Sequence, residues 1–157
     1  MSIVLRPISS SAAETLLGGR APDDVRVAPH YPTEFSSGVA EGVGGDSAVG
    51  PFFLHRVDDD VVVGEIGGGF TAPGVVEIGY AVVRSCWGRG YASDAVRGLV
   101  SRARETPAIV CLVAHTPLDR PASGRVLEKA GFTPVGEVDD EHDGVAVRVQ
   151  RWELPLR

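Results

Sequence analysis

The sequence predicts an α/β domain of the α+β type, in which a mixed, mostly antiparallel sheet of six to seven strands carries helices on both faces. Three observations predict this class. Between residues 52 and 83, short apolar runs separated by turn residues indicate neighbouring antiparallel strands. From residue 91 the apolar residues recur every three to four positions, as in an amphipathic helix. A nearly continuous apolar run at 108–114 then indicates a strand covered on both faces, beside a parallel neighbour.

The N-terminal third predicts one strand and two helices. Residues 3–5 form a short extended run that Pro7 ends, and the serines at 9–11 offer caps for a helix over 12–17 that Gly18 and Gly19 stop. A second helix is expected from residue 31 to about residue 43, followed by a loose segment at 44–47. We expect residues 20–50 to form a lid or a wall of an acceptor site.

The remaining elements follow from turn residues and apolar spacing. Residues 52–57 and 61–66 predict a hairpin around the aspartates at 58–60, and the glycines at 67–69 are expected to end or bend its second strand. A third strand is expected at 75–83, the amphipathic helix at about 91–103, and a further helix at about 121–130, which Gly131 stops. Two last strands are expected near 133–138 and 145–154, separated by an acidic turn at 139–144.

Composition excludes several classes of protein. The 157 residues carry a net charge of −6 and are 43% hydrophobic, which predicts one folded domain over residues 1–157 rather than a disordered chain. No apolar run is long enough to predict a membrane span, and the acidic balance argues against a nucleic-acid partner. Two cysteines without metal or redox spacing indicate a cytoplasmic protein, and four scattered histidines give no metal site.

The most informative segment joins the predicted strand at 75–83 to the helix that follows it. Gly88 and Gly90 allow a ligand to approach the backbone closely, and the first N–H groups of the helix favour an anion there. Arg89 adds positive charge, so a phosphate or pyrophosphate fits. The dinucleotide fingerprint fails because Ser93 stands where its third glycine belongs, and a P-loop fails because the only lysine, Lys129, lies elsewhere. The alternative is a plain glycine turn into a helix.

Three runs in order resemble the Gcn5-related N-acetyltransferase (GNAT) family, most closely the branch of the ribosomal-protein alanine N-acetyltransferases. These runs are residues 77–80, 87–92 and 122–132. The resemblance covers about residues 50–154. It implies a sheet that splits where two central strands diverge, with acetyl-CoA as donor.

The resemblance also implies the residues that hold the donor. The N–H groups of residues 88–92 would hold the pyrophosphate, and the end of the strand at 77–83 would pair with the pantetheine, leaving the N–H of Val82 or Val83 to polarise the thioester carbonyl. The residues expected to bind acetyl-CoA are Val82, Val83, Trp87, Gly88, Arg89, Gly90, Tyr91, Ala92, Ser93, Arg120 and Ser123.

Two positions depart from the family pattern. Ser85 stands where the phosphate motif often begins with Gln or Arg, and Arg120 stands where the branch usually carries an asparagine that orients the pantetheine. Contacts from the helix at 121–129 are expected to persist with altered detail, and Arg120 is expected to reach a coenzyme phosphate instead.

Acetyl transfer to an amine needs a neutral amine, a polarised thioester and a proton for the leaving thiolate. By resemblance, Ser123 would give that proton, although its hydroxyl could equally bond to local backbone. Glu77 is the first candidate for the base, with Glu141 or Asp140 as alternatives; a strand carboxylate is also often purely structural. Tyr80 could lie near the sulfur or in the core.

The sequence thus predicts an N-acetyltransferase that works by direct attack in a ternary complex, without an acetyl-cysteine at Cys86. The acceptor would be a small-molecule amine or a peptide N-terminus, with no nucleic-acid or membrane partner, and the chain would be a monomer or a homodimer. A non-catalytic acyl-CoA-binding sensor or interaction module with the same fold is the alternative.

Overall fold

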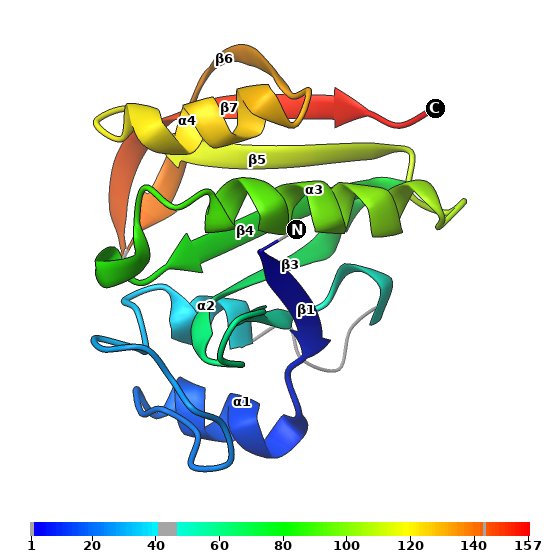
Figure 1. Ribbon diagram of the computed structural model, residues 1–157. Helices are drawn as coiled ribbons and strands as arrows, with labels where there is room; N and C mark the ends of the chain where they lie inside the picture. The colour runs from blue at the N-terminus through cyan, green and yellow to red at the C-terminus, as the bar shows by residue number, and fades with distance from the viewer. Residues whose placement is uncertain (1, 41–46, 143) are drawn as a thin grey trace.

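The structure is a computed structural model that describes residues 2–40, 47–142 and 144–157 (Figure 1). Its described strands form one seven-stranded sheet. The strands are β1 (Ile3–Pro7), β2 (Phe52–Arg56), β3 (Val62–Ala72), β4 (Val75–Val82), β5 (Cys111–Pro117), β6 (Thr133–His142) and β7 (Val145–Pro155). The helices are α1 (Ser10–Leu17), α2 (Ser36–Ala40), α3 (Tyr91–Arg104) and α4 (Pro121–Lys129), with 3-10 turns η1 (Ser47–Val49) and η2 (Arg84–Cys86).

The sheet has the order β1-β2-β3-β4-β5-β7-β6, and among its described strands every neighbouring pair is antiparallel except β4 and β5. The parallel pair arises because α3 carries the chain from the end of β4 back to the start of β5. The predicted mixed, mostly antiparallel sheet is therefore confirmed. No helix of the described chain is long and apolar enough to cross a membrane.

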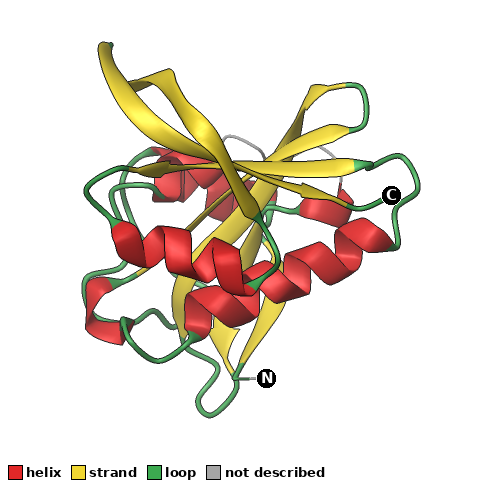
Figure 2. Ribbon diagram, turned by 90° about the horizontal axis from the view of Figure 1, so that it is seen from above, coloured by secondary structure: helices red, strands yellow, loops and turns green. Residues whose placement is uncertain are grey.

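Helices cover both faces of the sheet, as the sequence predicts. Helices α3 and α4 lie side by side on one face, while α1 and α2 lie on the other (Figure 2). The stripe predicted on α3 is buried: Tyr91, Ala95, Val96, Leu99, Val100 and Ala103 all face the core. Ser9 caps α1 by accepting a hydrogen bond from the N–H of Ala12, which is the role expected of the serine run.

Four expectations about the ends of elements differ from the structure. The glycines at 67–69 do not end β3, which runs to Ala72; a Cβ on Gly68 would lie 2.7 Å from Val76, so glycine is needed there for close packing. Strand β5 begins at Cys111 rather than 108, because Pro107 is followed by a turn and the N–H of Val110 donates to the carbonyl of Gly74.

Residues 139–142, expected in an acidic turn, form the end of β6 instead, since each pairs in register with β7. The helix expected from residue 31 begins only at Ser36, because residues 31–35 take an irregular path that places their polar groups on the sheet. The rest of its expected length, and the loose segment at 44–46, lie outside the described residues.

Candidate active site

The sheet opens in its middle. Strands β4 and β5 pair only where Val75–Glu77 face Cys111–Val113, although β4 continues to Val82 and β5 to Pro117. Beyond Glu77 the two strands diverge, which leaves backbone groups on both inner edges without a neighbouring strand. We call this opening the splay, and its closed end at Glu77 and Val113 the apex. The two central strands predicted to diverge are therefore β4 and β5.

The phase of the β3–β4 ladder decides which β4 amides face the splay. The N–H of Val83 donates to the carbonyl of Val63 at 2.9 Å, so Val83 is turned toward β3. Because antiparallel neighbours alternate, Tyr80 and Val82 turn their backbone groups the other way, toward the splay. Of the two alternatives for polarising a carbonyl, Val82 therefore has its N–H available, whereas the N–H of Val83 is bonded to β3.

The turn between β4 and α3 has the backbone of an anion site. Gly88 and Gly90 have φ angles of 79° and 82°, a left-handed conformation in which side chains are strained, and a Cβ on either would meet no atom within 4 Å. In the described chain, no group accepts a hydrogen bond from the N–H groups of residues 88–93. Arg89 is exposed beside them. We call residues 87–93 the phosphate turn.

Trp87 stands where the phosphate turn meets the splay. Its indole N–H donates to the carbonyl of Val82 at 2.7 Å, and the guanidinium of Arg84 lies over its ring at 5.4 Å. The indole therefore occupies the last β4 carbonyl that faces the splay, while 57% of the residue stays exposed. This contact holds the phosphate turn against the end of β4.

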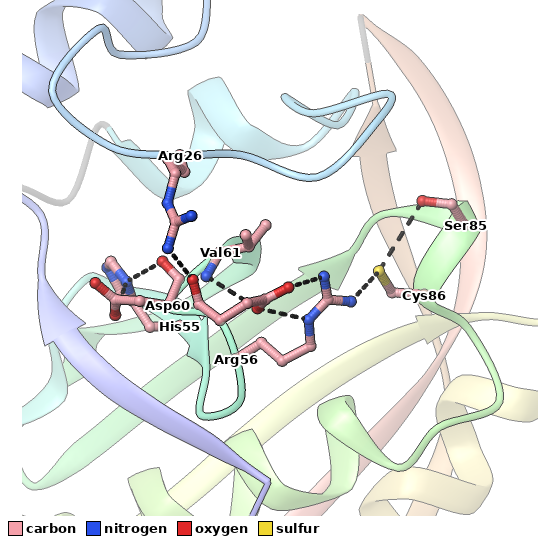
Figure 3. Close-up of polar contacts among 8 residues, drawn as sticks. Arg26, His55, Arg56, Asp60, Val61, Ser85 and Cys86 are labelled. Carbon is pink, nitrogen blue, oxygen red and sulfur yellow. Dashed lines mark hydrogen bonds and ion pairs between the residues drawn. The ribbon is translucent and has the colours of Figure 1, made fainter.

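Cys86 faces away from the splay. Its buried sulfur accepts a hydrogen bond from Arg56 at 3.8 Å, and it lies 4.0 Å from the hydroxyl of Ser85 (Figure 3). Arg56 in turn makes two hydrogen bonds to the carboxylate of Asp59, in the turn between β2 and β3. Ser85 donates to the carbonyl of Pro29. Cys86 and Ser85 thus anchor η2, and the rejection of Cys86 as a nucleophile stays a prediction.

A hydrogen bond joins helix α4 to β4 beside the splay. The phenol of Tyr80, on β4, donates to the carbonyl of Ser123 at 3.0 Å, and burial raises the pKa of that phenol well above its usual range. The Ser123 hydroxyl has no hydrogen-bond partner among the described residues, so the local backbone bond considered from sequence does not form. Tyr80 and Ser123 therefore lie on the α4 face of the splay.

Arg120 lies near α2 rather than near the phosphate turn. It donates to the carboxylate of Glu34 at 3.3 Å, and its guanidinium lies 5.6 Å from the centre of the Phe35 ring. These contacts join the start of α4 to the segment before α2, on opposite faces of the sheet. The expectation that Arg120 reaches a coenzyme phosphate stays a prediction.

Glu77 has a partner that the sequence analysis missed. Its Oε1 lies 2.5 Å from Nδ1 of His115, with the Glu77 side chain 41% exposed and that of His115 18% exposed. Glu77 belongs to the last β4–β5 pair, and His115 stands two residues beyond that pair on β5. The pair therefore lies at the apex. It is on the face opposite Tyr80, since neighbouring residues of a strand alternate between faces.

A buried carboxylate organises the α2 face. Glu65 on β3 is fully buried and accepts hydrogen bonds from Tyr31, Ser36 and Thr33, at 2.5, 2.7 and 3.3 Å. Burial raises its pKa, although these three hydroxyls oppose that shift. Glu65 faces Ala81 across the ladder and so shares a face with Glu77. It fixes the segment before α2 onto the sheet that carries the apex.

The other groups considered from sequence lie elsewhere. Asp140 and Glu141 are exposed on β6, the edge strand, and no contact in the described chain joins them to the splay. A shallow pocket of about 280 Å³ lies between α4 and the β5–β7 pair, with Arg120, Gly124 and Trp152 in its wall, and it includes no β4 residue. The described residues contain no group of three His, Cys, Asp or Glu that could hold a metal.

The split sheet and the phosphate turn are the features expected of an acyltransferase with a phosphorylated donor. A family model, the acetyltransferase (GNAT) domain, matches residues 2–133, and the chain therefore belongs to the GNAT family. The resemblance seen in the sequence is confirmed, and with it the prediction of an acetyl-CoA-dependent N-acetyltransferase. No protein of curated function matches the chain by sequence.

Solved structures of low identity share the fold. A GNAT-family acetyltransferase from Bacillus anthracis is 15% identical with a TM-score of 0.72, over 99% of this chain and 96% of that one. RimL, a ribosomal L7/L12 alpha-N-protein acetyltransferase in complex with coenzyme A, is 18% identical with a TM-score of 0.70, over 99% and 94%. An acetyltransferase from Salmonella typhimurium with its cofactor acetyl-CoA is 19% identical with a TM-score of 0.70, over 100% and 95%.

Proposed function

We propose that this protein transfers the acetyl group of acetyl-CoA to a primary amine, of a small molecule or a peptide N-terminus, by direct attack in a ternary complex. The observation that carries the proposal is the junction of the phosphate turn with the splay. Among the described residues, the N–H groups of residues 88–93 and that of Val82 have no acceptor, and the opening beside them ends at the Glu77–His115 pair. A donor with a phosphate end and an amide-bearing arm matches this order of groups.

The residues present fit acetyl-CoA, which supplies a thioester whose carbonyl carbon accepts the amine. The N–H groups of residues 88–93 and the Arg89 guanidinium would hold the pyrophosphate. The open edge of β4 would pair with the pantetheine amides, and the Val82 N–H would stabilise the negative charge that develops on the carbonyl oxygen. Trp87, Tyr91, Ala92 and Ser93 complete this binding path.

One face of the splay carries groups that can take a proton, and the other face carries a group that can give one. On the α2 face, the Glu77–His115 pair supplies a carboxylate and an imidazole that can take a proton from the acceptor. On the α4 face, the Ser123 hydroxyl has no partner in the described chain and can give a proton to the leaving sulfur. Tyr80 would position Ser123 by holding its carbonyl.

The test is release of free thiol from acetyl-CoA across a panel of amines and peptide N-termini, with donor binding measured in parallel. Turnover with at least one acceptor supports the proposal. Tight binding of acetyl-CoA with no turnover on any acceptor would favour the non-catalytic sensor. The feature that supports this alternative is Arg120, which stands where the family usually carries an asparagine. Failure to bind acetyl-CoA would contradict both functions.

A further inference from the structure

We propose that His115 is the group that takes the acceptor's proton, and that Glu77 is the residue that positions it. This inference rests on the proposed function, because it assigns a role within the same acetyl transfer. The carboxylate of Glu77 lies 2.5 Å from Nδ1 of His115 at the apex. The sequence analysis placed the base at Glu77 itself, and the geometry divides the task between the two residues.

The hydrogen bond fixes the tautomer of His115. An ionised carboxylate can only accept hydrogen bonds, so Nδ1 carries the proton that it donates to Glu77. In the neutral imidazole the lone pair then belongs to Nε2, the atom that acts as a base. Among the residues that the structure describes, none donates a hydrogen bond to Nε2. Glu77 thereby holds the ring in place and stabilises the cation formed when Nε2 takes a proton.

The position of His115 along β5 supports its role better than that of Glu77. Glu77 still pairs with Val113, so it belongs to the closed part of the sheet. His115 comes two residues later, where β5 has left β4 and forms one wall of the splay. A thioester that enters from the phosphate turn approaches the apex along that wall, so the imidazole lies beside the path on the acceptor's face.

The neighbouring charges leave the pair undisturbed. His115 faces Arg151 on β7, and Val113 faces Glu153 in the same register, so these two side chains share the face of the pair. Arg151 donates to the Glu153 carboxylate at 3.1 Å, which satisfies both groups within β7. Glu65, a further carboxylate of this face, is fully buried and accepts hydrogen bonds from three hydroxyls. Glu77 is therefore the carboxylate that pairs with His115.

The step balances with the residues present. The acceptor arrives as an ammonium ion, and His115 Nε2 takes one proton from it, which leaves a neutral amine and an imidazolium ion. The amine nitrogen forms a bond to the acetyl carbon while the carbon–sulfur bond breaks. Ser123 gives a proton to the sulfur, and the second amine proton replaces the one Ser123 has lost. The imidazolium then releases its proton to water, so the products are the amide, the free thiol and one proton.

Two substitutions of His115 separate a base from a structural residue. The side-chain amide of His115→Asn can donate to Glu77 in place of Nδ1 but has no atom in place of Nε2. We expect its kcat to fall at least a hundredfold, the range of general-base catalysis, with unchanged affinity for acetyl-CoA. Added imidazole should restore part of the rate of His115→Ala. Glu105→Gln, an exposed carboxylate at the end of α3, is the matched surface control.

A third readout needs neither donor nor acceptor. The nitrogen NMR spectrum of the imidazoles should show His115 protonated at Nδ1 and unprotonated at Nε2, and Glu77→Gln should disturb that pattern. His115→Asn with nearly wild-type kcat, or His115→Ala without imidazole rescue, would overturn the role of His115 while leaving the acetyltransferase intact. A wild-type chain that acetylates no acceptor would overturn the proposed function, and the role of His115 with it.

Discussion

Replacing Gly90 by alanine separates the cost of a left-handed backbone from the cost of filling the phosphate turn. Gly90 has a φ of 82°, and a Cβ there would meet no atom within 4 Å, so the folded chain offers no steric clash. The left-handed conformation alone costs about 1–2 kcal/mol for a residue with a side chain. At roughly 2–4 °C per kcal/mol for a chain of this size, Tm should fall by about 2–8 °C.

The loss of donor affinity should be larger than that strain explains. The new methyl group stands beside the N–H groups of residues 88–93, where the pyrophosphate would lie. Losing one hydrogen bond to a charged group costs about 1.5–3 kcal/mol, which is roughly a ten- to hundredfold rise in Kd. Isothermal titration with coenzyme A measures this change directly, and thermal unfolding of the free protein measures the strain.

Gly19 provides the matched control. Its φ is 77°, it also has no atom within 4 Å of an added Cβ, and it follows α1, away from the phosphate turn. Gly19→Ala should therefore lower Tm by a similar amount and leave the Kd for coenzyme A unchanged. Equal Kd values for Gly90→Ala and Gly19→Ala would refute the assignment of residues 88–93 as the pyrophosphate site.

Three further substitutions test the parts that support the site. Since burial raises the pKa of Glu65, the folded chain binds its proton more tightly than the unfolded chain, and stability falls as pH rises from the unfolded pKa to the folded one. Glu65→Gln should remove this dependence of the unfolding free energy on pH, which is at most about 1.4 kcal/mol per pH unit. Urea unfolding at several pH values measures it, and an unchanged slope would contradict the buried carboxylate's role. Gly124→Ala places a Cβ 2.8 Å from the Trp152 ring, so the unfolding free energy should fall by about 1–3 kcal/mol. A variant as stable as the wild type would show that α4 can shift to make room. Tyr80→Phe removes the bond to the Ser123 carbonyl and should lower kcat with a stability loss of about 0.5–1.5 kcal/mol; wild-type kcat would deny Tyr80 a positioning role.

The phosphate turn could be predicted from sequence because its pattern is local. Gly88 and Gly90 take the left-handed backbone that glycines allow, directly before a helix whose apolar spacing is unambiguous. The choice between Val82 and Val83 could not be made from sequence. Whether an amide faces the splay depends on the phase of the ladder, which the bond from Val83 to Val63 sets, and no local pattern carries that phase.

The Glu77–His115 pair could not be found from spacing along the chain. The two residues are 38 positions apart, and they meet because Glu77 faces Val113 in the parallel ladder. The available signal was that the two residues lie on the two strands of one strand–helix–strand unit. Side chains alternate between faces along a strand, so Glu77 and His115 point to the same face of the sheet. Glu65 was missed for a similar reason, since its three hydroxyl partners come from an irregular segment without a helical or extended pattern.

The splay also divides the molecule mechanically. The strands β1–β4 and the strands β5–β7 form two half-sheets whose strands pair, in the described chain, through the short β4–β5 ladder at the apex. Contacts between helices α3 and α4 and the Arg120–Glu34 pair also join the two halves. We expect bending of the sheet to occur mainly at that ladder, and the bond from Tyr80 to the Ser123 carbonyl links the two half-sheets. A bound donor would bridge the open ends like a missing strand, so donor binding should slow amide hydrogen exchange in both half-sheets together.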